Sequence, residues 1–178
     1  RRLAFYVTAR GVTNEVYYMA QKVARFLGTH HIDNAARLCH APSGVAMREM
    51  LGVAASTCAY ADWIGADVVV FLGSNPANDQ PVSTKYLLLA RRRGTRVVLV
   101  NPCLEPGMRR YWVPSDAASA TFGSDLADHW FPVRPDGDAA FLYGTLKSLL
   151  DRGAVDAAWI ASHTTGFEAL RSRVESLD

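Results

Sequence analysis

Cys39 and His40 are adjacent in the sequence, and they combine a metal-binding thiol with a proton-transfer group. A cysteine thiolate binds soft and redox-active metals, and its reactivity depends on a lowered pKa. The neighbouring imidazole can stabilise that thiolate or move a proton near neutral pH. Pro42 suits the first turn of a helix, which predicts that Cys39 lies just before a helix N-terminus, where the helix dipole favours a thiolate. We therefore take this pair as candidate catalytic residues, with Cys39 as a candidate metal ligand.

The same pair allows two other interpretations. A single cysteine is often a small buried packing residue, and the histidine beside it would then lie on the surface. Cys39 could also be the nucleophile of a hydrolase or transferase with His40 as its base. Adjacent residues rarely place their side chains for a direct thiol–imidazole hydrogen bond, however, and the sequence offers no evident third group to orient them.

Polar residues follow two apolar segments that predict buried strands of a parallel sheet, residues 68–72 and 96–100. Backbone N–H groups at a helix N-terminus hold phosphate, and Asn or Asp side chains can read the edge of a base or ribose. In open parallel sheets, ligands bind outside the carboxyl ends of the strands. The candidate binding residues at these two strand ends are Gly73, Asn75, Asn78, Asp79 and Asn101. An ordinary polar turn is the alternative interpretation.

The wider pattern predicts an α/β protein. Further strands are expected over residues 3–7 and 130–133, and residues 68–100 read as a βαβ unit with a helix of about a dozen residues ending near Arg93. Helices are also predicted over 14–27, 42–51, 139–150, 155–162 and 167–174, with Asp138 as a cap. Residues 117–124 are expected to form an exposed loop. Residues 30–33 are expected to be a short connection in which the rings of His30 and His31 point to different sides.

Composition narrows the class of protein. The 178 residues are 49% hydrophobic and 20% charged, which is typical of a globular chain. The net charge of +2 gives no argument for nucleic acid, and the basic run 91–93 is expected to be a solvated helix end. Three widely spaced cysteines form no disulfide framework, which favours a reducing, cytoplasmic compartment. Neither a signal peptide nor an apolar run of membrane-spanning length is present.

Two common nucleotide-binding motifs are missing from the sequence. No GxGxxG follows a strand and no GxxxxGK[ST] occurs, which disfavours an ordinary Rossmann dinucleotide site and a P-loop. The chain starts without Met inside an expected strand and ends inside an expected helix. We therefore expect it to be part of a larger protein.

Four blocks in order resemble the molybdopterin-guanine-dinucleotide oxidoreductases, in particular the formate dehydrogenase alpha-subunit branch. Residues 8–15 resemble the S/G-x-R-x-T-N-E loop, and residues 39–43 the Cys/Sec-His-Gly-Pro-Ser segment. Residues 73–81 resemble the G-x-N-P-A-x-x-x-P nucleotide loop, and residues 134–138 the R-x-G-x-D/N turn. The resemblance extends from residue 3 to residue 175.

The resemblance implies a fold and a cofactor. The fold would be a parallel-sheet, Rossmann-like three-layer domain, with residues 1–178 as one central domain. Cys39 would ligate molybdenum or tungsten of a bis-molybdopterin guanine dinucleotide, and His40 would assist proton transfer. The strand-end residues would hold the nucleotide, and Arg10 and Asn14 would line the same crevice. The resemblance also implies further domains of the same enzyme, an Fe–S cluster in a preceding region and an electron-transfer partner. The enzyme would act on a small-molecule substrate, with formate as the reference.

Two departures from the family pattern affect these expectations. Position 101 is Asn where the family often has Asp, and Asp136-Gly137 reverses the usual order at the turn before the 139–150 helix. A non-catalytic nucleotide-binding module is the main alternative, because an α/β scaffold alone does not establish chemistry.

Overall fold

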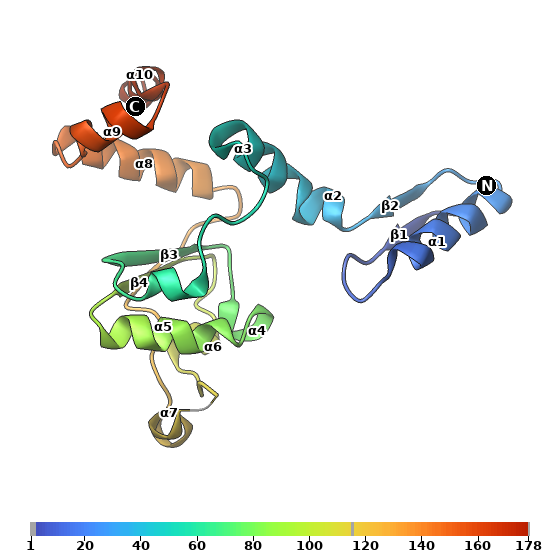
Figure 1. Cartoon of the computed structure of the whole chain (residues 1–178), viewed down its shortest axis with the longest axis horizontal. Coiled ribbons are helices and arrows are strands. Elements are labelled where there is room, and N and C mark those ends of the chain that lie inside the picture. The colour runs from blue at the N-terminus through green and yellow to red at the C-terminus, as the bar shows by residue number, and fades with distance from the viewer. Residues whose placement is uncertain (1–2, 115, 178) are drawn as a thin grey trace. The chain divides into compact units, whose positions relative to one another are not determined.

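The structure is a computed structural model that describes residues 3–114 and 116–177. The chain has the predicted α/β architecture, in which parallel strands alternate with helices (Figure 1). It divides into two compact units, which we call unit 1 (Arg1–Cys58) and unit 2 (Ala59–Asp178). The sheet of each unit is described separately below.

Unit 1 is a β–α–β arrangement followed by two helices. Strands β1 and β2 pair in parallel, with a register that runs from Phe5↔Ile32 to Val7↔Asn34. Strand β2 corrects the expectation that this segment is only a connection: pairing with β1 overrides the low strand propensity of its Asp and Asn. The elements are β1 (Phe5–Val7), α1 (Asn14–Phe26), β2 (Ile32–Asn34), α2 (Ala36–Cys39) and α3 (Ala41–Leu51).

Unit 2 contains a three-stranded sheet in the order β3-β4-β5, and all of its pairs are parallel. The predicted βαβ unit is present with boundaries within about a residue of those expected. The elements are η1 (Tyr60–Trp63), β3 (Val68–Leu72), α4 (Pro76–Asp79), α5 (Ser83–Arg92), β4 (Arg96–Val100), α6 (Pro106–Arg109), α7 (Ala117–Phe122), β5 (His129–Phe131), α8 (Asp138–Asp151), α9 (Ala157–His163) and α10 (Phe167–Glu175).

The core of unit 2 lies on one face of this sheet. Side chains alternate between the faces of a strand, so Val97 and Leu99 of β4 point to the same side, and both are fully buried. Helix α5 supplies Leu87 and Leu88 to this layer, and Figure 1 shows α5 running alongside β3 and β4. The buried cluster is Phe71, Leu87, Leu88, Val97, Leu99, Met108, Val113 and Leu126.

The other face of β3 is less covered than its sequence suggests. A continuous apolar run predicts burial on both faces, yet Val68, Val70 and Leu72 are 51%, 48% and 40% exposed. The prediction of a fully buried strand is therefore wrong for this face. Helix α8 covers part of the sheet farther along, where the rings of Phe131 and Phe141 lie 5.5 Å apart.

The expected loop at residues 117–124 is wrong, because most of this segment forms helix α7. The carboxylate of Asp116 accepts a hydrogen bond from Ser119 N–H at 2.8 Å, which satisfies a free amide of the first turn. Asp116 also pairs with Arg92 at 2.8 Å. The basic run 91–93 is thus only partly a solvated helix end, since Arg91 is paired as well, with Asp128.

The turn before α8 shows how the backbone accommodates the reversed Asp-Gly order. Asp136 has a φ of +66°, a left-handed conformation that glycine adopts at lower cost. At the next position, a Cβ on Gly137 would lie 2.8 Å from the carbonyl oxygen of Arg134, so a larger residue would collide with the backbone. Gly137 is the N-cap of α8, and the side chain of Asp138 makes no capping hydrogen bond, which corrects the predicted cap.

Within the described residues, no helix has both the length and the apolar character required to cross a membrane.

Candidate functional site

The loop after β1 carries Arg10 and leads into α1, whose first residue is Asn14. Both residues are exposed. The loop is held by Thr8, whose carbonyl accepts a hydrogen bond from the Tyr17 hydroxyl and whose Oγ1 accepts one from Arg10 N–H at 3.3 Å. These contacts fix the path of the chain beside the carboxyl end of β1 and leave the Arg10 guanidinium in solvent.

Cys39 and His40 follow the carboxyl end of β2, the other strand of the same sheet. The amide of Ala35 donates to the carbonyl of Val7 at 3.0 Å, so the start of α2 lies against the end of β1. Cys39 is the last residue of α2, and His40 is the N-cap of α3. Both are exposed, so the interpretation of Cys39 as a buried packing residue is wrong.

Two residues that the sequence analysis missed position the Cys39 segment. Asn34, which directly precedes the N-cap Ala35, accepts a hydrogen bond at its Oδ1 from Ala36 N–H at 2.6 Å and so holds the chain at the start of α2. Asp33 forms an ion pair with Arg37 one helical turn later, and that hydrogen bond lowers the pKa of the Asp33 carboxyl below its usual range. The sequence analysis predicted no helix at residues 36–39, so it gave no reason to assign a role to Asn34.

In unit 2, the loop after β3 begins at the edge of the sheet. Gly73 has a φ of +57°, and its N–H donates to the carbonyl of Val100 at 3.0 Å. This bond holds the loop beside the end of β4. Asn75 is the N-cap of the single-turn helix α4, and its carbonyl accepts from the amides of Asn78 and Asp79 at 3.1 and 3.0 Å. The side chains of Asn78 and Asp79 are exposed.

The side chain of Asn75 has a distinctive environment. Its Oδ1 atom is buried, and within the described part of the chain it has no hydrogen-bond partner. An unpaired buried acceptor is costly, because it has lost its water without gaining another donor. The atom is therefore suited to accept a hydrogen bond from a ligand.

The remaining predicted residue at this edge, Asn101, is held by β5. Its N–H donates to the carbonyl of Phe131 at 3.2 Å, and its carbonyl accepts from Trp130 Nε1–H at 2.9 Å. Because Leu72 pairs with Val100, the residues after β3 and after β4 start at the same end of the sheet. The structure therefore brings the predicted residues of unit 2 to one carboxyl edge.

Close packing of two short helices fixes this edge. Gly107 of α6 lies against Ala77 of α4, and a Cβ at position 107 would lie only 2.5 Å from the Cβ of Ala77. Ala77 and Pro76 are both buried. The loops after β3 and β4 are thus packed against one another through contacts that only a small residue at position 107 allows.

The predicted residues fall into two groups. Arg10, Asn14, Cys39 and His40 follow the strand ends of unit 1, and Gly73, Asn75, Asn78, Asp79 and Asn101 follow those of unit 2. That the two groups share one cleft remains a prediction. Within residues 3–114 and 116–177, no three His, Cys, Asp or Glu side chains are grouped as a metal site.

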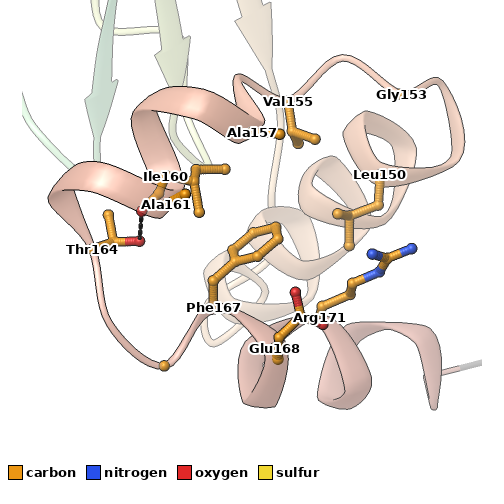
Figure 2. A pocket seen from close by; sticks show the side chains of 11 residues that line it. Leu150, Gly153, Val155, Ala157, Ile160, Ala161, Thr164, Phe167, Glu168 and Arg171 are labelled. Carbon is orange, nitrogen blue, oxygen red and sulfur yellow. Dashed lines mark hydrogen bonds between the residues drawn. The ribbon is translucent and has the colours of Figure 1, made fainter.

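The larger cavities lie elsewhere. One of about 500 Å³ is enclosed by the end of α8 and by α9 and α10. Figure 2 shows Phe167 pointing into it, with the Thr164 hydroxyl bonded to the carbonyl of Ile160. Another, of about 650 Å³, separates α8 from the sheet at Val70 and Val98. Neither is lined by a predicted site residue.

The histidine pair departs from the expected geometry. The amide of Ile32 donates to the carbonyl of His30 at 2.9 Å, which closes a three-residue turn. This turn brings the imidazole rings of His30 and His31 within 4.6 Å, so the expectation that they point to different sides is wrong. Both residues are exposed, as predicted.

Comparison with known proteins gives the context for this geometry. A family model described as molybdopterin oxidoreductase matches residues 1–171. Protein YdeP of Escherichia coli (strain K12) is 29% identical over 97% of this chain and 24% of its own length. Formate dehydrogenase H of the same strain is 28% identical over 94% of this chain and 21% of its own length. The alpha subunit of F420-dependent formate dehydrogenase 2 of Methanococcus maripaludis is 28% identical, over 97% and 23%. The chain thus spans about a quarter of the length of these curated relatives.

Proposed function

The chain belongs to the molybdopterin oxidoreductase family, and we propose that it is the central domain, residues 1–178, of an oxidoreductase that binds a molybdopterin guanine dinucleotide. The observation that carries the proposal is the match to the family over residues 1–171. Candidate metal-binding and nucleotide-binding side chains also follow the strand ends of both units. Likeness to two formate dehydrogenases supports formate as the reference substrate.

The residues of unit 2 fit the nucleotide end of such a cofactor. The buried and unpaired Oδ1 of Asn75 suits a donor such as a base N–H or a ribose hydroxyl. Asn78, Asp79 and Asn101 would supply further polar contacts at the same edge, and the N–H groups after Gly73 would approach phosphate.

In unit 1, Cys39 would be the protein ligand of molybdenum or tungsten. A thiolate suits a redox-active metal that also carries sulfur ligands from the pterin, and the Cys39 side chain is exposed and free of any disulfide. When bound, the cofactor supplies the transfer of electrons from substrate. His40 would accept or relay the proton that leaves the substrate. Arg10 and Asn14 would face phosphate or substrate.

The rest of the proposal concerns the longer protein. We infer that further domains complete the cofactor cage, that an Fe–S cluster and an electron-transfer partner accept the electrons, and that the enzyme acts on a small molecule in the cytoplasm. The three free cysteines are in keeping with a reducing compartment.

The test is Cys39→Ala in the intact protein that contains this chain. We expect formate oxidation with an artificial electron acceptor to fall to background, because the metal loses its protein ligand, while the guanine nucleotide content of the purified protein is retained. Metal and pterin content would be measured on the same samples. Cys58→Ala is the matched control, since Cys58 is also an exposed cysteine of unit 1.

Full activity in Cys39→Ala would contradict the role of the thiol. Guanine nucleotide binding with neither metal nor pterin in the wild-type protein would instead identify a non-catalytic binding module. Alkylation of Cys39 that blocks a metal-independent hydrolysis would favour the cysteine nucleophile.

A further inference from the structure

The backbone of Asn101 is constrained from three directions. Phe131 accepts its N–H at 3.2 Å, and Trp130 Nε1–H donates to its carbonyl at 2.9 Å. Pro102 follows, and a residue before proline is restricted to extended backbone conformations. Together these constraints fix the direction in which the Asn101 side chain leaves the sheet.

The register of the sheet explains why an indole makes this contact. Trp130 of β5 pairs with Leu99 of β4, and Asn101 lies two residues beyond Leu99, directly after the end of β4. From this position the indole reaches the backbone carbonyl of Asn101, to which its Nε1–H donates. The indole is 39% exposed, so burial alone does not account for a tryptophan at this position. Its N–H is the feature that a smaller aromatic residue would lack.

The side-chain amide of Asn101 is left available by this arrangement. All of the hydrogen bonds that Asn101 makes to other described residues use its backbone N–H and carbonyl. The residue is partly buried at the end of β4, beside the loop that begins at Gly73. Its amide can therefore offer both a donor and an acceptor to a ligand at the carboxyl edge.

We propose that Trp130 is a positioning residue of the nucleotide site, which holds the carbonyl of Asn101 and thereby orients the Asn101 amide toward the nucleotide end of the cofactor. This inference rests on the proposed function. It adds a specific contact from the edge strand β5, outside the four sequence blocks that indicate the family.

The experiment measures binding of guanosine monophosphate to the intact protein, purified without cofactor, by titration calorimetry. Trp130→Phe keeps an aromatic ring but removes the N–H donor, and we expect it to weaken binding about five-fold, the effect of one net hydrogen bond. Trp112→Phe is the matched control, because Trp112 is a 66% exposed tryptophan of the same unit, and it should leave binding unchanged. Thermal unfolding of each variant is recorded in parallel.

A double-mutant cycle separates positioning from general damage. If Trp130 acts through Asn101, Trp130→Phe should have no further effect in an Asn101→Ala background. Equal weakening in both backgrounds, or unchanged binding in Trp130→Phe alone, would overturn the positioning role and leave the proposed function intact. Unchanged binding in Asn101→Ala would overturn the nucleotide role of this edge itself.

Discussion

Asp128 links two strands and a helix through one carboxylate. Its Oδ2 accepts a hydrogen bond from Val97 N–H at 2.7 Å, and its carboxylate is paired with Arg91 at the end of α5. Partial burial raises the pKa of the Asp128 carboxyl, but the hydrogen bonds from Arg91 and Val97 outweigh this effect and hold the pKa below its usual range. The ionised form is therefore favoured by folding.

Asp128→Asn should lower the free energy of unfolding by about 1 to 2 kcal/mol at pH 7, because it removes a charge-assisted hydrogen bond. A carboxyl whose folded pKa is depressed contributes stability above its unfolded pKa of about 3.9 and loses it as the pH falls through the folded value. The difference between wild type and variant should thus shrink below about pH 4. Urea denaturation of wild type and Asp128→Asn at pH 7 and pH 3 measures this difference in the free energy of unfolding.

Asp125→Asn is the control for this prediction. Asp125 is exposed, and it contacts Arg91 only through its backbone carbonyl, which the substitution keeps. A stability difference for Asp128→Asn that stays constant from pH 7 to pH 3 would contradict the electrostatic explanation.

At the scale of single residues, the sequence predicted which residue types stand at the strand ends but not their environments. The position of His40 directly before α3 follows from Pro42, whereas the exposure of Cys39 and the short helix α2 that ends at it do not follow from the local pattern. The unpaired Oδ1 of Asn75 could not be predicted, because burial of one side-chain atom depends on neighbours that the chain order does not reveal. The turn that brings His30 and His31 together depends in the same way on the start of β2.

Gly107 and Ala77 control the packing of α6 against α4. We expect Gly107→Ala to lower the free energy of unfolding by about 1 to 3 kcal/mol, the usual cost of overpacking, since its Cβ would lie 2.5 Å from that of Ala77. The displacement of α4 should also weaken binding of guanosine monophosphate. Chemical denaturation and calorimetry measure the two effects.

Two further variants test the steric explanation. Ala77→Gly removes the clashing methyl group and should restore part of the stability of Gly107→Ala. Gly144→Ala adds a methyl group within α8, where no atom lies within 4 Å, and should be neutral or stabilising by up to about 1 kcal/mol. Failure of Ala77→Gly to restore any stability would count against a direct clash.

At the scale of elements, apolar or strongly periodic segments were predictable, the short strands β1 and β5 included, whereas short elements built of polar or small residues were not. Strands β3 and β4 and helix α5 follow from local pattern alone. Strand β2 was missed because two of its three residues are polar and its existence depends on pairing with β1. Helix α7 was missed because its small residues show no apolar face, although the Asp116 cap was readable.

The two units differ in how much they bury. Among the described residues of unit 1, only Ala24 and Thr29 are buried, whereas unit 2 holds the whole eight-residue core cluster. Exposed apolar residues are frequent on α1, including Phe26 at 90% exposure. Chains of about 60 residues are marginal even with a good core. The difference predicts that the units have unequal stability in isolation.

We expect residues 59–178 expressed alone to unfold with a cooperative thermal transition, and residues 1–58 alone to show none. Circular dichroism at 222 nm measures both fragments. The full chain, heated under the same conditions, serves as the reference. A cooperative transition of the 1–58 fragment would show that its few buried contacts suffice.

The uncovered side of β3 affects how this protein will behave on the bench. β3 is an edge strand of the described sheet, and the side chains of Val68, Val70 and Leu72 form an exposed apolar surface along it. Exposed apolar edge strands favour association between molecules as the protein concentration rises. Dilute samples, or samples with a mild detergent that covers this apolar surface, should stay monodisperse. Concentrated samples without detergent should aggregate.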